Sequence, residues 1–93
     1  MSSTTVAAAA GDTTITIHDF AFGTSITVKA GATVTVKNSD ITTQTLAADD
    51  GGFDTGNVFA GKATTFVAPT KPGTYKFHCN IHANMHGVLD VAA

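Results

Sequence analysis

The stretch TTITIHDFAFGTSITVKAGATVTVKN, residues 13 to 38, alternates apolar and polar side chains with a period of two. The apolar positions that carry the alternation are Ile15, Ile17, Ile26, Val28, Val34 and Val36. Successive side chains of a β-strand point to opposite faces, and β-branched residues suit a pleated surface, so the pattern predicts three strands with one buried face. Gly23, Gly31, Asn38 and Asp40 have the character of turn residues that end these strands. The stretch therefore predicts an all-β fold.

The rest of the chain continues this pattern after one irregular segment. Residues 46 to 63 are rich in glycine and aspartate and predict a long loop or an irregular sheet edge. Three further strands are expected at residues 64–69, 73–79 and 87–92. About seven short strands at this spacing are typical of a Greek-key antiparallel β-sandwich.

Length and composition indicate one globular domain. The chain has 93 residues, of which we expect residues 1–11 to form a flexible leader and residues 12–93 the domain. Charged residues make up 13 %, about half the usual share, and the formal net charge is −2. No basic patch favours nucleic acid as a partner, and no apolar run approaches the roughly 20 residues that span a bilayer. We expect a monomer without a membrane span.

Metal-binding residue types are concentrated in YKFHCNIHANMHG, residues 75 to 87. This stretch holds the only cysteine, three of the four histidines and one of the two methionines. Strand parity places Tyr75, Phe77 and Cys79 on one face, which the aromatic residues indicate is the buried one. We therefore expect Cys79 to point inward at the end of a core strand and His78 to point outward.

The intervals between three of these residues favour a common site. His82 follows Cys79 by three positions and Met85 follows His82 by three, and a tight turn here brings residues three apart close together. Copper accepts thiolate, imidazole and thioether, and cysteine with two histidines and a distant methionine is its electron-transfer site. Nucleophilic catalysis also uses cysteine beside histidine, but no oxyanion device or third orienting residue is evident, so we do not expect an enzyme.

GTYKFHCNIHANMHG, residues 73 to 87, resembles the ligand loop of the cupredoxins, the small blue copper proteins. The spacing Cys-x2-His-x2-Met is similar to the short-loop, amicyanin-like members. The likeness extends over nearly the whole domain through ITIHDFAFGTSITVKAGATVTVKNSD, ADDGGFDTG and KPGTYKFHC. It implies an eight-stranded sandwich, with Cys79, His82 and Met85 as ligands of Cu(II)/Cu(I). It also implies one-electron transfer with a transient redox protein partner, in the periplasm or outside the cell.

The upstream histidine ligand of the family is replaced here. In NSDITTQTLAADDG, residues 38 to 51, alignment without gaps places Gln44 in the histidine position, and His18 lies on the polar face of an early strand. Gln44 either fills a polar position in a weakened site or binds the metal through its amide oxygen, with or without water. Ile81 and Ala83 also replace prolines that often flank the loop histidine.

The sequence leaves further interpretations open. His86 is a reserve ligand, because Cys79, His82 and His86 have the spacing Cys-x2-His-x3-His, which overlaps the spacings of zinc ligands. Zinc is therefore possible, and the protein would then be a redox-poor metal carrier. The same alignment makes Asn38 and Thr45 candidates for residues that orient the ligands. The phenylalanines are expected mostly in the core, although Phe53 could instead cover the site.

Overall fold

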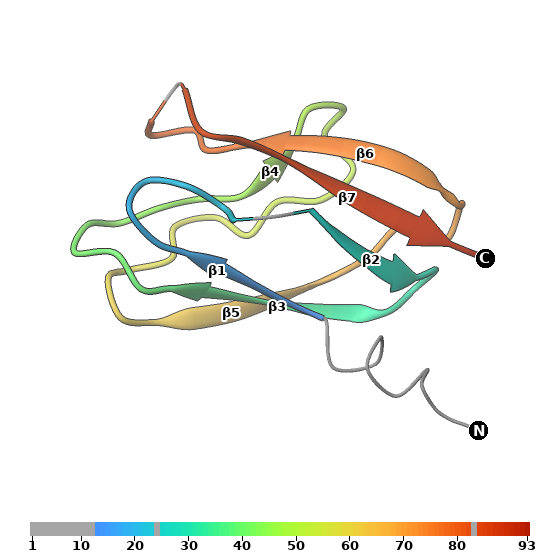
Figure 1. Cartoon of the computed structure of the whole chain (residues 1–93), viewed down its shortest axis with the longest axis horizontal. Coiled ribbons are helices and arrows are strands. Elements are labelled where there is room, and N and C mark those ends of the chain that lie inside the picture. Colours follow the sequence, from blue (N-terminus) through green and yellow to red (C-terminus); the bar gives the residue numbers. More distant parts are fainter. Residues whose placement is uncertain (1–12, 24, 83) are drawn as a thin grey trace.

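The computed structural model describes residues 13–23, 25–82 and 84–93, so the expected leader and Asp12 lie outside the described residues. This part of the chain forms two sheets that face each other (Figure 1). Its seven strands are β1 Thr14–Ile17, β2 Ile26–Lys29, β3 Thr33–Asn38, β4 Ala47–Ala48, β5 Ala63–Val67, β6 Gly73–His78 and β7 His86–Ala92. No helix in these residues is long and apolar enough to cross a membrane.

The two sheets have the orders β1-β3-β5 and β2-β7-β6-β4. The pairs β3–β5, β4–β6 and β6–β7 are antiparallel, whereas β1–β3 and β2–β7 are parallel. The all-β sandwich is therefore confirmed, but the expectation of antiparallel pairing was wrong for these two pairs. The reason is that the chain leaves the first sheet at the end of β1, forms β2 in the second, and returns as β3. This double crossing leaves β1 and β3 running in the same direction.

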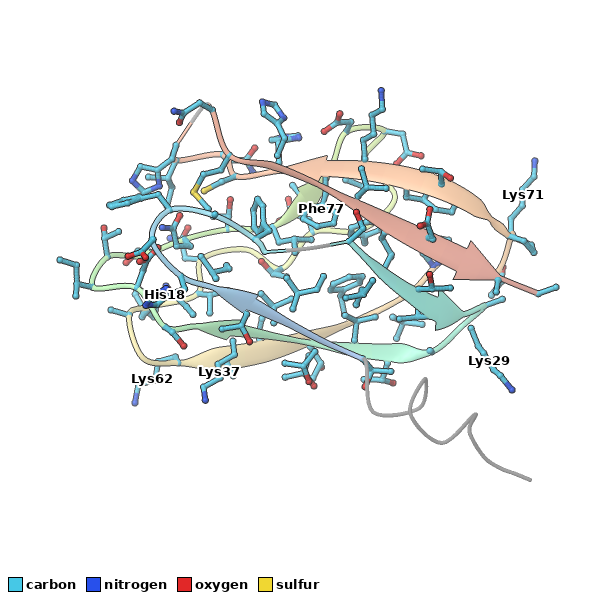
Figure 2. The ribbon with its side chains drawn as sticks, in the orientation of Figure 1. His18, Lys29, Lys37, Lys62, Lys71 and Phe77 are labelled. Atoms are coloured by element: carbon cyan, nitrogen blue, oxygen red, sulfur yellow. The ribbon has the colours of Figure 1, made fainter. Side chains whose placement is uncertain are left out.

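The core lies between the sheets and follows the predicted alternation. In β3, Val34 and Val36 are buried while the threonines between and before them are not. Phe77 projects between the sheets from β6 (Figure 2), with its ring centroid 4.9 Å from that of Phe22. Phe53 stacks on Phe66 at 4.6 Å and so belongs to the core.

The described parts of three connections gather at one end of the sandwich: residues 18–23, residues 39–46, and residues 79–82 with 84–85 (Figure 1). The first begins with a tight turn, in which the backbone N–H groups of His18 and Ala21 each donate to the other's carbonyl, at 3.0 and 3.1 Å. Its central residues have positive φ, 53° at Asp19 and 58° at Phe20, as in a type I′ turn. This end of the molecule carries the candidate site.

Candidate metal centre

Cys79 is the central residue of the candidate site, a cluster that it forms with Gln44 and His82. It follows β6 directly, and its side chain is 2 % exposed, as strand parity predicted. The backbone N–H of Thr45 lies 3.5 Å from its Sγ, and the Thr45 hydroxyl lies 3.7 Å away. Two segments that are far apart in the sequence are therefore joined at this sulfur.

The structure brings His82 and Gln44 to the same point. Cys79 Sγ lies 3.3 Å from Gln44 Oε1 and 3.8 Å from His82 Nδ1, and these last two atoms are 2.9 Å apart. Because an amide oxygen only accepts hydrogen bonds, Gln44 Oε1 accepts from both the thiol and the imidazole N–H. Sulfur, nitrogen and oxygen atoms of Cys79, His82 and Gln44 thus converge on one point.

Met85 closes the loop that carries Cys79 and His82. Its backbone N–H donates to the His82 carbonyl, and its carbonyl accepts from the Cys79 N–H, each at 3.1 Å. The Met85 side chain is 2 % exposed and, like Cys79, belongs to the hydrophobic core of the sandwich. The backbone therefore fixes the two ends of the loop against each other.

The pKa of the Cys79 thiol is about 7, below its usual value of 9.0. Burial alone would raise this pKa, but backbone N–H groups of Thr45, His82 and Ile81 stabilise the thiolate and outweigh it, together with the His82 side chain. The thiolate is the metal-binding and reactive form of cysteine. The local structure therefore favours the form that a metal needs.

Hydrogen bonds hold both the backbone and the side chain of Gln44. Its side chain is fully buried, and its backbone N–H and carbonyl pair with Val58 at 3.0 and 2.7 Å. Its Nε2 donates to Asp40 Oδ2 at 2.9 Å, which leaves Oε1 directed at Cys79 and His82.

Asn38 and Thr45 have the contacts expected of orienting residues. The buried Asn38 donates through Nδ2 to the carbonyls of Thr42 and Val58 and accepts the Asp40 N–H, so it shapes the segment before Gln44. Thr45 accepts the Asn80 N–H at 2.7 Å as well as facing the thiol.

Sequence reasoning treated Asp40 only as a turn residue and missed Phe20. The Phe20 ring packs edge-on against the His82 imidazole, with centroids 5.0 Å apart, and is 51 % exposed. Asp40 accepts the N–H groups of Asp19 and Phe20, at 2.8 and 2.9 Å. A signal for Asp40 was present in its position four residues before Gln44, but no local pattern signals a left-handed turn at Phe20.

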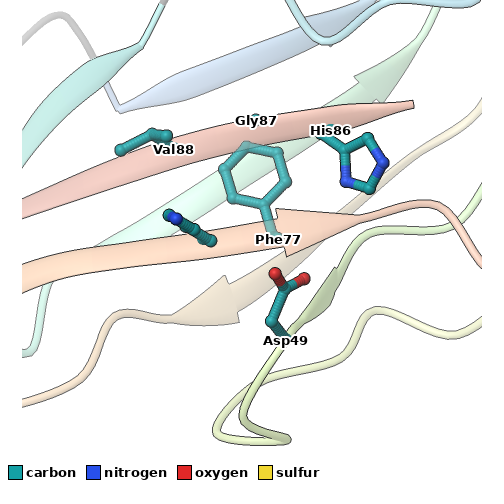
Figure 3. Close-up of a pocket in the computed structure, with 6 residues that line it drawn as sticks. Asp49, Phe77, His86, Gly87 and Val88 are labelled. Atoms are coloured by element: carbon teal, nitrogen blue, oxygen red, sulfur yellow. The ribbon is translucent and has the colours of Figure 1, made fainter. Parts of the chain in front are cut away.

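The structure does not bring His86 to the cluster. His86 is exposed and pairs across β6–β7 with His78, which bonds Asp49 at 2.6 Å. Figure 3 shows His86, Gly87 and Val88 beside a shallow hollow of 460 Å³ that Asp49 also lines. Within the described ranges, no three His, Cys, Asp or Glu side chains are grouped to hold a metal ion.

The donor set at Cys79 nevertheless suits a metal once the amide is included. Bonds of about 2.0–2.3 Å in a tetrahedral site place ligand atoms about 3.3–3.8 Å apart. The separations from Cys79 Sγ to Gln44 Oε1 and His82 Nδ1, 3.3 and 3.8 Å, match this range. The 2.9 Å contact between His82 and Gln44 is a hydrogen bond that a metal would replace.

Three solved structures are similar to this chain in overall fold. The Cu(I) form of an amicyanin mutant is 26 % identical, with a TM-score of 0.74 over 85 % of this chain and 80 % of that chain. An oxidized amicyanin mutant is 24 % identical, with a TM-score of 0.75 over 88 % and 83 %. A copper-containing nitrite reductase from Thermus scotoductus is 23 % identical, with a TM-score of 0.75 over 86 % of this chain but 22 % of its own.

The curated protein sequences contain no match to the chain. The family model of the cupredoxin-like domain, in contrast, matches residues 1–91, almost the full length. The chain therefore belongs to the cupredoxin-like family.

Proposed function

We propose that this protein is a mononuclear copper-binding electron carrier with a variant type 1 site. Cys79, His82 and Met85 are the ligands, and Gln44 supplies its amide oxygen where the family has a histidine. The observation that carries the proposal is the convergence of Cys79 Sγ, His82 Nδ1 and Gln44 Oε1 within 3.8 Å of one another. When bound, copper supplies the change between Cu(II) and Cu(I) that carries one electron.

The residues of the chain would serve this role in distinct ways. The buried Cys79, whose thiol ionises near pH 7, supplies the thiolate, and the fully buried Gln44 excludes water from one side. His82 is only half-buried, so it is the ligand through which an electron can reach the surface. Phe20 packs on that imidazole and limits its motion.

The surface around His82 suits transient docking of a redox protein. Phe20, Ile41 and Ile81 are 51 %, 93 % and 47 % exposed. Phe20 contacts the His82 ring, and its backbone N–H is held by Asp40. In the sequence, Ile41 follows Asp40 and Ile81 precedes His82. Clustered apolar side chains of this kind are typical of interaction sites. Ala83, which replaces the other flanking proline, lies outside the described residues.

The same proposal places the protein outside the cytoplasm, as a monomeric carrier rather than an enzyme. The basis for the carrier role is the half-buried His82, which brings one proposed ligand close to the surface at the end of the sandwich. The likeness to a nitrite reductase concerns the fold, because it covers 22 % of that enzyme's chain.

Copper titration followed by optical and electron paramagnetic resonance spectroscopy tests this function. We expect an intense thiolate-to-copper visible band in the native chain and its loss in Cys79→Ser. Gln44→His restores the softer imidazole, so copper should bind more tightly and give a more ordinary blue site. Tight copper binding with a spectrum unchanged by Cys79→Ser would contradict the proposal, and zinc binding without a copper band would favour a redox-poor metal carrier.

A further inference from the structure

The Asp40 carboxylate joins both sides of the candidate site. Its Oδ2 accepts from Gln44 Nε2 at 2.9 Å and from the Phe20 N–H at 2.9 Å, and its Oδ1 accepts the Asp19 N–H at 2.8 Å. A carboxylate offers acceptors only, so every group directed at it must be a donor.

This restriction decides which way the Gln44 amide lies. An amide has one accepting oxygen and one donating NH2 group, which are nearly equal in size. In the observed orientation the NH2 faces Asp40, while the oxygen faces the donors of Cys79 and His82. The reverse orientation would set the amide oxygen against the carboxylate, and the amide could not turn to solvent instead, because Gln44 is 0 % exposed.

We propose that Asp40 is the positioning residue that selects the oxygen of Gln44, rather than its nitrogen, to face Cys79 and His82. An amide NH2 donates hydrogen bonds and does not ligate a metal, so this choice determines whether Gln44 is a ligand. The consequence for copper rests on the proposed function above, whereas the orientation itself is a property of the metal-free chain.

The orientation is tested first on the metal-free native protein by nuclear magnetic resonance. We expect a scalar coupling across the hydrogen bond between Gln44 Nε2 and the Asp40 carboxylate carbon. We also expect slow hydrogen exchange of this NH2, faster by about ten-fold in Asp40→Asn, since a bond to a charged group is lost. Fast exchange in the native chain, or a coupling to another group, overturns the proposal even if Asp40→Asn fails to fold.

The consequence for the metal is tested by a double-mutant cycle. Asp40→Asn should weaken copper binding by about ten-fold and change the copper hyperfine splitting. In a Gln44→Leu background there is no amide to orient, so the same substitution should change affinity by less than about two-fold. Equal effects in both backgrounds would show that Asp40 acts only through the turn at Phe20, and would overturn the proposal.

Asp54→Asn is the matched control, because Asp54 also accepts a backbone N–H, from Gly56 at 2.8 Å, in an exposed turn. This substitution should leave both the hydrogen exchange of the Gln44 NH2 and the copper affinity unchanged. If the native chain binds no copper, the proposed function fails, but the coupling and exchange measurements still decide the orientation of Gln44.

Discussion

At the scale of single residues, the candidate site is a polar cluster that is satisfied without a metal. Gln44 Oε1 accepts hydrogen bonds from Cys79 and His82, and its NH2 is held by Asp40. Buried polar groups are costly unless they are paired, and here every one of these side chains has a partner. The metal-free protein should therefore fold with its donors already close together.

The lowered pKa of Cys79 predicts a pH-dependent stability of the metal-free protein. The thiol ionises near pH 7 when folded and near its usual 9.0 when unfolded. Between these values the unfolded chain binds more protons, so stability rises with pH across this window and the gain is absent below about pH 7. We expect a gain of about 2 kcal/mol in urea unfolding between about pH 6 and pH 9.

Cys79→Ala isolates this contribution, because the other titrating groups are common to both proteins. The native chain should gain stability relative to the variant as the pH rises. A difference in unfolding free energy between the native chain and the variant that does not change with pH would contradict a lowered pKa at Cys79.

At the scale of elements, the β6–β7 pair is constrained by a close contact at Gly87. A Cβ at this position would lie 2.4 Å from Phe77 Cε1, far inside van der Waals contact. The Phe77 ring is buried and packs edge-on against Phe22, so it has little room to move. Glycine at the start of β7 thus lets the strand approach the aromatic core next to the site.

We predict that Gly87→Ala destabilises the protein by about 1–3 kcal/mol in chemical unfolding, as overpacking does. Phe77→Leu removes the ring edge that the new methyl group meets. The double variant should therefore be more stable than the sum of the two single effects implies. Strict additivity would mean that Gly87 matters for another reason.

The strands show what sequence could and could not predict. The period of two at Val34 and Val36, and the parity of Cys79 with Phe77, follow from local geometry and were confirmed. The parallel β1–β3 and β2–β7 pairs were not predictable, because periodicity fixes which face is buried but not which strand lies beside it. The hydrogen bond between Asp40 and Phe20 was missed for the same reason, since it joins two loops twenty residues apart.

At the scale of the whole molecule, the candidate site joins two connections. One leaves the first sheet after β3 and enters the second sheet at β4, and the other links β6 to β7 within the second sheet. Gln44 lies between β3 and β4, while Cys79, His82 and Met85 lie between β6 and β7. A ligand held by both connections binds the folded state only, so binding should raise the stability of the entire sandwich.

We predict that copper raises the thermal midpoint in scanning calorimetry. At a free concentration of about 100 times the dissociation constant the gain is about 2.7 kcal/mol, or about 10–20 °C for a domain of this size. Cys79→Ser should abolish most of this increase. An equal increase in His86→Ala is also expected, because His86 is exposed on the outer face of β7. A loss of the increase in His86→Ala would mean that the metal binds elsewhere.

The direction of β7 has a practical consequence for measuring electron transfer. The strand begins one residue after Met85 and runs to Ala92 at the opposite end of the sandwich (Figure 1). Seven residues of strand span about 23 Å, so the carboxyl end and the His82 loop lie on opposite poles of the domain. Chains tethered to an electrode through Ala93 would present the His82 end to the solution. Chains attached at Ile81 would instead turn the His82 end toward the electrode. Voltammetry of the two orientations would therefore compare slow and fast interfacial electron exchange in the same folded protein.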